Sequence, residues 1–113
     1  MKKIGVVIPC YKEGGLLRRA WASLDSQSDN DFERIIINDN PKHLPTVAAC
    51  RDLAEKACAR VLWHEKNKGT AAARNSGCEA LQTEIIVPLD ADDSLPKDTI
   101  KTIRDNFLEI AFV

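Results

Sequence analysis

The sequence is poor in glycine, with 5 glycines in 113 residues, and it lacks the glycine-rich loops that cradle phosphates in many nucleotide-binding proteins. The loop after the first apolar run, residues 9–15, reads Pro-Cys-Tyr-Lys-Glu-Gly-Gly. It contains no Gly-x-Gly-x-x-Gly, so the fingerprint of a dinucleotide-binding domain is absent. The chain also has no Gly-x-x-x-x-Gly-Lys-Ser/Thr segment, which excludes a P-loop.

Neither an excess of one charge nor a long hydrophobic run is present. The 16 basic and 17 acidic residues give a net charge of −1, so no nucleic-acid partner is expected. No apolar run is long enough to cross a bilayer, and the start of the chain shows no small-residue cleavage site, so no signal peptide is expected. A length of 113 residues allows one modest domain, which we expect to be cytoplasmic.

Metal-binding cysteine and histidine motifs are also missing. No two cysteines form a Cys-x-x-Cys pair, and His43 and His64 do not have zinc-ligand spacing, so a zinc site is not expected. Structural disulfides are not expected in a reducing cytosol. We therefore expect four buried or half-buried thiols, at Cys10, Cys50, Cys58 and Cys78. The core is expected to hold the aromatic residues Trp21, Trp63 and Phe107.

Apolar runs typical of buried strands alternate with segments of helical periodicity. Strands are expected at 4–8, 32–37, 60–64 and 84–89, and a further strand is expected to begin at 111–113. Helices are expected through 17–24, at 44–59 and 70–81, and from 95–96 onward. This alternation predicts an α/β fold, with a mostly parallel sheet of about four strands and helices on both faces. Right-handed crossovers bring the carboxyl ends of the strands to one edge, where we expect one polar crevice formed by residues 9–13, 38–39, 67–74 and 90–93.

Three aspartates, Asp90, Asp92 and Asp93, follow the last of the four apolar runs. Negative charges this close repel each other unless a cation or protons relieve them. Carboxylates are hard oxygen ligands that suit Mg²⁺ or Mn²⁺. The alternative is a solvated acidic turn that leads into a helix. An EF-hand loop is excluded, because its sixth position would be Leu95 rather than glycine and its twelfth Lys101 rather than glutamate.

One motif stands at the end of each of the four expected strands. The motifs are Val7-Ile8-Pro9-Cys10-Tyr11-Lys12-Glu13, then Ile36-Ile37-Asn38-Asp39-Asn40, then residues 67–77 with a Gly-x-x-x-x-Arg-Asn pattern, and finally Leu89-Asp90-Ala91-Asp92-Asp93 with an Asp-x-Asp pattern. In this order they resemble the motifs of family 2 glycosyltransferases, and they cover nearly the whole chain. The resemblance implies a Rossmann-like half of the GT-A fold that binds a nucleotide sugar.

The sequence departs from the family pattern in two respects. The second motif of the family usually begins with two acidic residues, and here Asn38 replaces the first of them, while Asn40-Pro41 replaces the usual Gly-Ser. Family members also continue well beyond the Asp-x-Asp motif, and the part that follows it carries the acceptor site and the catalytic base. The resemblance therefore implies that residues 1–113 are the truncated, N-terminal nucleotide-sugar-binding part of a longer enzyme.

No convincing catalytic residue is found in this chain. The resemblance implies that the general base lies beyond Val113, the last residue of the sequence. The chain by itself is therefore expected to be inactive in sugar transfer.

The resemblance also assigns roles to the three aspartates after the fourth strand. Asp92 is the expected ligand of Mn²⁺ or Mg²⁺, and Asp90 is expected to contact ribose or sugar. Asp93 is either an alternative metal ligand or the cap of the next helix.

The nucleotide-sugar site implied by the resemblance further includes Pro9, Tyr11, Glu13, Asp39 and Arg74. Asp39 is the expected acceptor for the imide N–H of uracil. Tyr11 stacks on the base or packs at the strand end, and Glu13 binds the nucleoside or caps the first helix. Arg74 is expected near the base or the diphosphate, since a guanidinium suits planar, bidentate recognition.

The function implied by the resemblance is an inverting transfer of sugar from a UDP-sugar to the hydroxyl of a saccharide or lipid-linked acceptor. The full-length protein would be cytoplasmic or peripheral at the inner face of the membrane, and apolar surface exposed by truncation would favour self-association. Two alternatives remain open. A nucleotidyltransferase would carry a glycine- and arginine-rich loop in place of residues 10–13. A non-catalytic, flavodoxin-like module with an acidic pocket would bind metal without nucleotide.

Overall fold

The computed structural model describes residues 3–110, and the side chains of residues 3–106. Four strands alternate with four helices in this part of the chain, in which no helix is long and apolar enough to span a bilayer. The elements are β1 (Ile4–Cys10), α1 (Leu16–Asp25), β2 (Glu33–Asn38), α2 (Leu44–Lys56), β3 (Val61–Trp63), α3 (Thr70–Leu81), β4 (Ile85–Pro88) and α4 (Thr99–Ile110).

Three expectations about the end of the chain fall outside this description. The first is the strand expected to begin at residues 111–113, and the second is the core position expected for Phe107. The third is the general base, which the family resemblance assigns to sequence beyond Val113. All three stay predictions.

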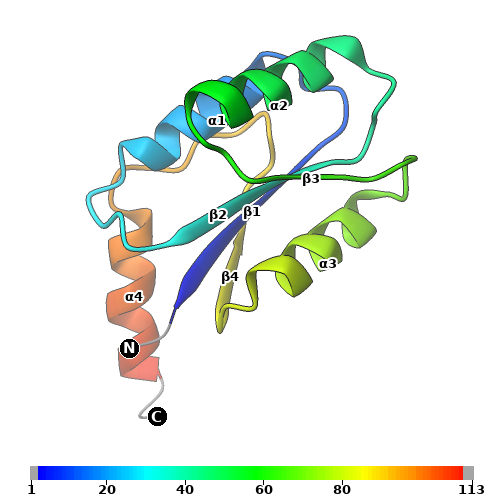
Figure 1. Ribbon diagram of the computed structural model, residues 1–113. Helices are drawn as coiled ribbons and strands as arrows, with labels where there is room; N and C mark the ends of the chain where they lie inside the picture. Colours follow the sequence, from blue (N-terminus) through cyan, green and yellow to red (C-terminus); the bar gives the residue numbers. More distant parts are fainter. Residues whose placement is uncertain (1–2, 111–113) are drawn as a thin grey trace.

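The strands form one parallel sheet in the order β3-β2-β1-β4 (Figure 1). This confirms the predicted α/β fold with a parallel sheet of four strands. The chain moves outward from β1 to β3 and then returns to place β4 on the other side of β1, so the strand order reverses between β1 and β4. In open α/β sheets, ligands bind outside the carboxyl ends of the strands at such a reversal.

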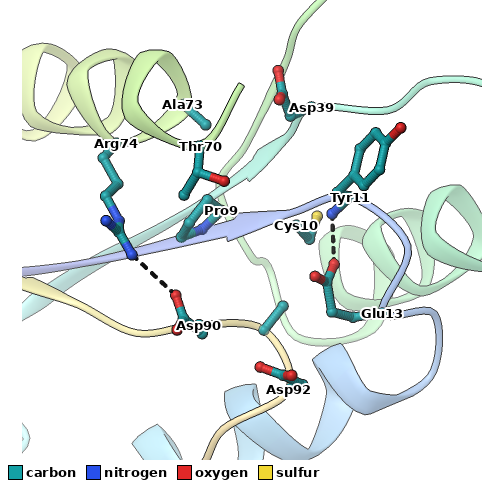
Figure 2. A pocket seen from close by; sticks show the side chains of 11 residues that line it. Pro9, Cys10, Tyr11, Glu13, Asp39, Thr70, Ala73, Arg74, Asp90 and Asp92 are labelled. Atoms are coloured by element: carbon teal, nitrogen blue, oxygen red, sulfur yellow. Dashed lines mark hydrogen bonds and ion pairs between the residues drawn. The ribbon is translucent and has the colours of Figure 1, made fainter. Parts of the chain in front are cut away.

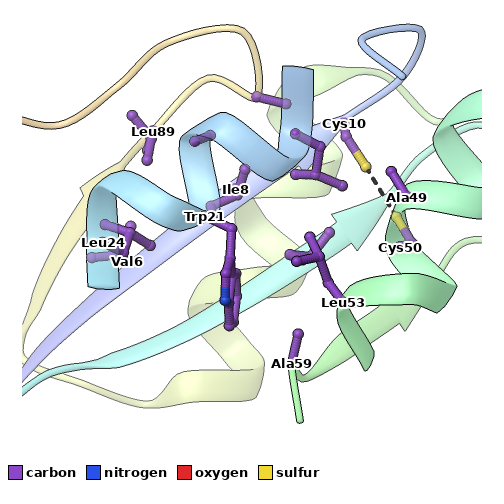
Figure 3. Packing of buried hydrophobic residues seen from close by; sticks show 14 of the residues in the cluster. Val6, Ile8, Cys10, Trp21, Leu24, Ala49, Cys50, Leu53, Ala59 and Leu89 are labelled. Atoms are coloured by element: carbon purple, nitrogen blue, oxygen red, sulfur yellow. Dashed lines mark hydrogen bonds between the residues drawn. The ribbon is translucent and has the colours of Figure 1, made fainter. Parts of the chain in front are cut away.

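Helices cover both faces of the sheet, as predicted (Figure 1). Successive side chains of a strand point to opposite faces. Val6 and Ile8 of β1 therefore join the cluster formed with α1 and α2, where Trp21 is also buried (Figure 3). Val7 joins a smaller cluster under α3. The all-apolar run of β1 thus reflects burial on both faces, which is typical of a central parallel strand.

α3 packs closely against β1 at Gly77. A Cβ atom on Gly77 would collide with the side chain of Val7, which is fully buried. The absence of a side chain lets the helix lie near the sheet. This contact helps to hold α3 against the sheet.

Two prolines are accommodated in strands because their missing N–H donors point away from ladder partners. The N–H of Leu89 donates to the carbonyl of Val7 at 2.9 Å, so the preceding Pro88 faces the open edge of β4, where proline is tolerated. Pro9 faces the same side as Val7, past the last residue of β4. β1 consequently continues through Pro9 to Cys10, beyond the boundary predicted.

α4 begins at Thr99, later than the predicted start at residues 95–96. The side-chain amide of Gln27 donates to the carbonyl of Leu95 at 3.1 Å and to that of Pro96 at 2.7 Å. These hydrogen bonds hold the segment before Thr99 as a non-helical connection. Apolar periodicity alone does not show this competition from a distant side chain.

Two exposed side chains contradict their predicted burial. Trp63 is 42% exposed because β3 is an edge strand, and its ring lies near the guanidinium of Arg51, 6.0 Å away. Cys58 is exposed because α2 ends at Lys56, before the predicted residue 59, and the chain then turns away with a left-handed φ of 54° at Cys58. The other three thiols are buried or half-buried as predicted, and all four are free.

Candidate functional site

A polar cavity of about 390 Å³ lies at the carboxyl edge of the sheet, where the strand order reverses (Figure 2). It is bounded by the end of β1, the loop after β2, the start of α3 and the turn after β4. The four motif loops therefore converge on one cleft. The lining includes all but one of the residues assigned to the site from the sequence, namely Pro9, Tyr11, Glu13, Asp39, Arg74, Asp90 and Asp92. Asp93 lies next to the cavity but does not line it.

The turn after β4 carries three exposed carboxylates, which we call the acidic corner: Asp90, Asp92 and Asp93. Each offers an oxygen within 4.8 Å of those of the other two. The N–H of Asp93 donates to the carbonyl of Asp90 at 2.9 Å, which closes a tight turn. Because α4 begins only at Thr99, the alternative role of Asp93 as a helix cap is wrong.

The acidic corner is chemically suited to a divalent cation. Within the part of the chain that the structure describes, the carboxylate of Asp92 makes no hydrogen bond or ion pair, and it lies at the cavity (Figure 2). Asp90 instead pairs with Arg74, with 3.2 Å between Oδ1 and Nη2. Both side chains of this pair are about half exposed, so it adds little to stability. The carboxylate of Asp93 likewise has no hydrogen-bond or ion-pair partner among the described residues. A group of oxygen donors with two unpartnered carboxylates fits Mg²⁺ or Mn²⁺ and leaves room for phosphate oxygens.

Asp39 lies at the opposite end of the cavity and is held quite differently. It is 4% exposed. Its Oδ1 accepts from Nδ1 of His64 at 2.7 Å and from the N–H of Lys68 at 3.0 Å, and its Oδ2 accepts from the N–H of Gly69 at 2.9 Å. An ionised carboxylate has about four acceptor positions. One position, on Oδ2, therefore remains for a ligand.

His64 is a site residue that the sequence reasoning missed. It follows β3 directly and is 5% exposed. Its Nδ1 faces Asp39, and its Nε2 lies 2.8 Å from Oγ of Ser76 on α3. In the sequence, His64 was weighed only as a zinc ligand. Its position at the carboxyl end of an expected strand was the signal that could have placed it at the site.

Asn38, which stands where the family has an acid, is turned into the protein rather than into the cavity. It is fully buried, its Oδ1 accepts from the N–H of Asn40 at 2.9 Å, and its Nδ2 lies 3.5 Å from Sγ of Cys50. A neutral amide suits this position, because an unpaired charge would be costly to bury. The departure from the family pattern therefore leaves Asp39 as the acid of this loop that reaches the cavity.

Cys10 lines the cavity but is not suited to act as a nucleophile. Its Sγ lies 3.6 Å from Sγ of Cys50 (Figure 3). The hydrogen bond with Cys50, together with burial, raises the pKa of the Cys10 thiol well above its ordinary value. A thiol that stays protonated at neutral pH is a poor nucleophile.

The loop after β1 presents an aromatic face. Tyr11 is 38% exposed, so its ring is not packed into the core. Its backbone N–H donates to Oε1 of Glu13 (Figure 2). No side chain caps α1, whose N-cap is Gly15, so the alternative role of Glu13 as a helix cap is wrong. Glu13 instead closes the loop that carries Tyr11.

A parallel sheet with a polar cleft at its strand reversal defines a Rossmann-like α/β protein with a ligand site at the carboxyl edge. Residues 5–111 match the sequence model of Glycosyl transferase family 2. The chain belongs to this family. The resemblance drawn from the four motifs is thereby confirmed, and the nucleotidyltransferase and flavodoxin-like alternatives are not supported.

A curated relative agrees with this assignment, and solved structures are similar to the chain in fold. The succinoglycan biosynthesis protein ExoW of Rhizobium meliloti is 36% identical over 97 residues, which is 82% of this chain and 30% of ExoW. The crystal structure of S. aureus TarS 1-349 in complex with UDP has a TM-score of 0.79 at 23% identity, covering 95% of this chain and 32% of that one. The mannosyltransferase PcManGT from Pyrobaculum calidifontis, in complex with GDP-Man and Mn²⁺, has a TM-score of 0.73 at 23% identity, covering 84% and 29%.

These structural likenesses establish the fold, which is the Rossmann-like GT-A fold expected from the resemblance. The chain spans less than a third of the length of the curated relatives that it matches.

Proposed function

We propose that the cleft binds a nucleotide sugar, with a UDP-sugar as the donor class, together with a divalent cation, as the donor-binding part of an inverting glycosyltransferase. The observation that carries this proposal is that Asp39, Arg74 and the acidic corner meet in one cavity. The TarS structure with UDP and the PcManGT structure with GDP-Man and Mn²⁺ support this class of ligand.

The base of the nucleotide is assigned to the end of the cavity at Asp39. The remaining acceptor position on Oδ2 suits the imide N–H of uracil, which is a donor. Tyr11 supplies an exposed aromatic face on which a base can stack, and Glu13 orients that loop through the N–H of Tyr11. Pro9, at the end of β1, completes this part of the lining.

The diphosphate and sugar are assigned to the end of the cavity at the acidic corner. Asp92 would hold the cation, with Asp93 as a second donor, and Asp90 would contact ribose or sugar. Arg74 faces this corner, and its guanidinium suits bidentate binding of phosphate oxygens. When bound, a divalent cation supplies Lewis-acid stabilisation of the charge that develops on a diphosphate leaving group.

Sugar transfer also needs a general base and an oriented acceptor. The carboxylates that line the cleft, apart from Asp92, are already engaged: Asp39 accepts three hydrogen bonds, Asp90 pairs with Arg74, and Glu13 accepts from Tyr11. We therefore assign the general base, and the site for a saccharide or lipid-linked acceptor, to sequence beyond Val113. The fact that this chain spans less than a third of its relatives supports that assignment.

Calorimetric titration with UDP, in the presence and absence of Mn²⁺, tests the proposal. We expect Mn²⁺ to tighten UDP binding by roughly tenfold or more, equivalent to about 1.4 kcal/mol. Asp92→Asn should remove most of this gain, and Asp93→Asn should remove a smaller part of it, because Asp93 is the second donor. Full Mn²⁺ dependence in Asp92→Asn would exclude Asp92 as the ligand, and absence of UDP binding in every condition would overturn the nucleotide assignment.

A further inference from the structure

We infer that His64 is a positioning residue that sets base selectivity in the cleft, because it holds the carboxylate of Asp39 in the orientation that accepts a donor from the base. The inference rests on the proposed function and deepens it. His64 does not line the cavity, so it acts through Asp39 and not by touching the nucleotide.

The geometry around Asp39 singles out His64 among its partners. The donors from Lys68 and Gly69 are backbone N–H groups of an exposed loop. His64 supplies the one side-chain donor in this set, at 2.7 Å, and both partners are about 5% exposed. A buried side-chain hydrogen bond of this kind restricts the carboxylate more than bonds from a loop that water can reach.

The ring of His64 is itself fixed at both nitrogens. An ionised carboxylate only accepts hydrogen bonds, so Nδ1 of His64 carries the proton that faces Asp39. In the neutral ring Nε2 is then an acceptor, and the hydroxyl of Ser76 lies 2.8 Å away to donate to it. His64 therefore links the end of β2, through Asp39, to α3, the helix that also carries Arg74.

This arrangement predicts selectivity for uracil over cytosine. Uracil presents an N–H donor where cytosine presents a lone pair, and only the donor matches an acceptor on Asp39. If Asp39 can rotate away, the uracil nucleotide loses its hydrogen bond while the cytosine nucleotide loses nothing. Loss of His64 should therefore weaken UDP binding and leave CDP binding nearly unchanged, which a purely structural role would not do.

The test compares UDP and CDP affinities, measured by calorimetry with Mn²⁺, in the wild-type chain and in substituted chains. The wild type should prefer UDP by roughly tenfold or more. His64→Leu removes both ring hydrogen bonds and should bring the preference to about one, with CDP affinity within about twofold of wild type. Ser76→Ala frees one end of the ring and should give a preference between these two values.

Two amide variants form a matched pair, which allows the test to be made even if His64→Leu does not fold. The amide nitrogen of Asn lies near the position of Nδ1, so His64→Asn should largely restore the preference for UDP. The longer His64→Gln places its amide near the position of Nε2 and should reach Ser76 but not Asp39. It should therefore behave like His64→Leu. Melting temperatures of all variants identify any that do not fold.

The outcomes separate this inference from the proposed function. Equal UDP and CDP affinities in the wild type, or no UDP binding, would overturn the assignment of Asp39 to uracil and the role of His64 with it. A wild type that prefers UDP, together with a His64→Leu variant that keeps the preference, would overturn only the role of His64. Equal ratios in His64→Asn and His64→Gln, or a parallel loss of UDP and CDP affinity, would also overturn it.

Discussion

Asp39 and Asp92 line the same cavity, but their carboxylates have opposite environments. Asp39 is 4% exposed and accepts hydrogen bonds from His64, Lys68 and Gly69. Asp92 is exposed, stands beside two other aspartates, and its carboxylate makes no hydrogen bond or ion pair within the described part of the chain. One carboxylate is a fixed part of the folded protein, and the other is open to a ligand.

The difference indicates that the two ends of the cleft have different functions, which we call the division of labour along the cleft. A buried acceptor whose position is set by three donors is preorganised, so little freedom is lost when a base binds. The acidic corner has like charges in close contact, and a cation would relieve their repulsion. We therefore expect selectivity to depend on the Asp39 end and metal-dependent affinity to depend on the acidic corner.

Removing the two carboxylates should have very different effects on stability. Asp39→Ala leaves the buried Nδ1–H of His64 unpaired and releases the loop at residues 68–69, so we expect a loss of about 3 kcal/mol in the free energy of unfolding. Asp92→Ala should change it by no more than about 0.5 kcal/mol, with a tendency to stabilise. Urea unfolding of both variants measures this. Equal losses would contradict the comparison.

Gly69→Ala should destabilise the loop that holds Asp39, although no side chain is removed. Gly69 has φ 96° and ψ 161°, a conformation nearly restricted to glycine, and apart from Gly69 and its two chain neighbours no described residue has an atom within 4 Å of the position of an added Cβ. The cost is therefore conformational, about 1–3 kcal/mol, and the N–H that Gly69 donates to Asp39 would be displaced. Thermal unfolding measures the loss.

The matched control for this substitution is Gly15→Ala. Gly15 has φ −64° and ψ −17° at the start of α1, which alanine adopts readily, so we expect a change of no more than about 0.5 kcal/mol. If Gly69→Ala were as mild as Gly15→Ala, the loop at Gly69 would not be fixed against Asp39.

Arg74→Gln should test the exposed end of the cleft with the smallest effect on folding. The pair between Arg74 and Asp90 is about half exposed, so its loss should cost no more than about 0.5 kcal/mol. UDP affinity should fall several-fold, because a guanidinium near the diphosphate is lost. Calorimetry at low and high salt measures this effect, which should shrink as salt screens the interaction. An unchanged UDP affinity would remove Arg74 from the site.

Much of the fold can be predicted from local patterns. The helix predicted over residues 70–81 has the observed bounds of α3, since its alanine-rich sequence and the flanking turn signals agree. The four motif loops meet as expected because parallel strands share a carboxyl edge. The errors arise where contacts between residues far apart in the sequence determine the local structure. The exposure of Trp63 depends on β3 being an edge strand, and the late start of α4 depends on Gln27, far away in the sequence.

The candidate site shows the same limit. Asp39, Arg74 and the acidic corner could be found because each belongs to a local motif. His64 could not, because its partners Asp39 and Ser76 meet it only after β3 has paired with β2 and α3 has packed on the sheet. The number of hydrogen bonds that Asp39 already accepts is likewise set only by folding. In the folded site it accepts three, so one acceptor position remains open.

The division of labour along the cleft is tested most directly by titrating the chain with uridine and with UDP, each with and without Mn²⁺, using NMR to follow weak binding. Uridine lacks the diphosphate, so its affinity should not depend on Mn²⁺ and should be unchanged in Asp92→Asn. UDP should gain roughly tenfold or more from Mn²⁺ in the wild type and little in Asp92→Asn. Mn²⁺-dependent binding of uridine, or UDP binding that ignores both Mn²⁺ and Asp92, would contradict the account.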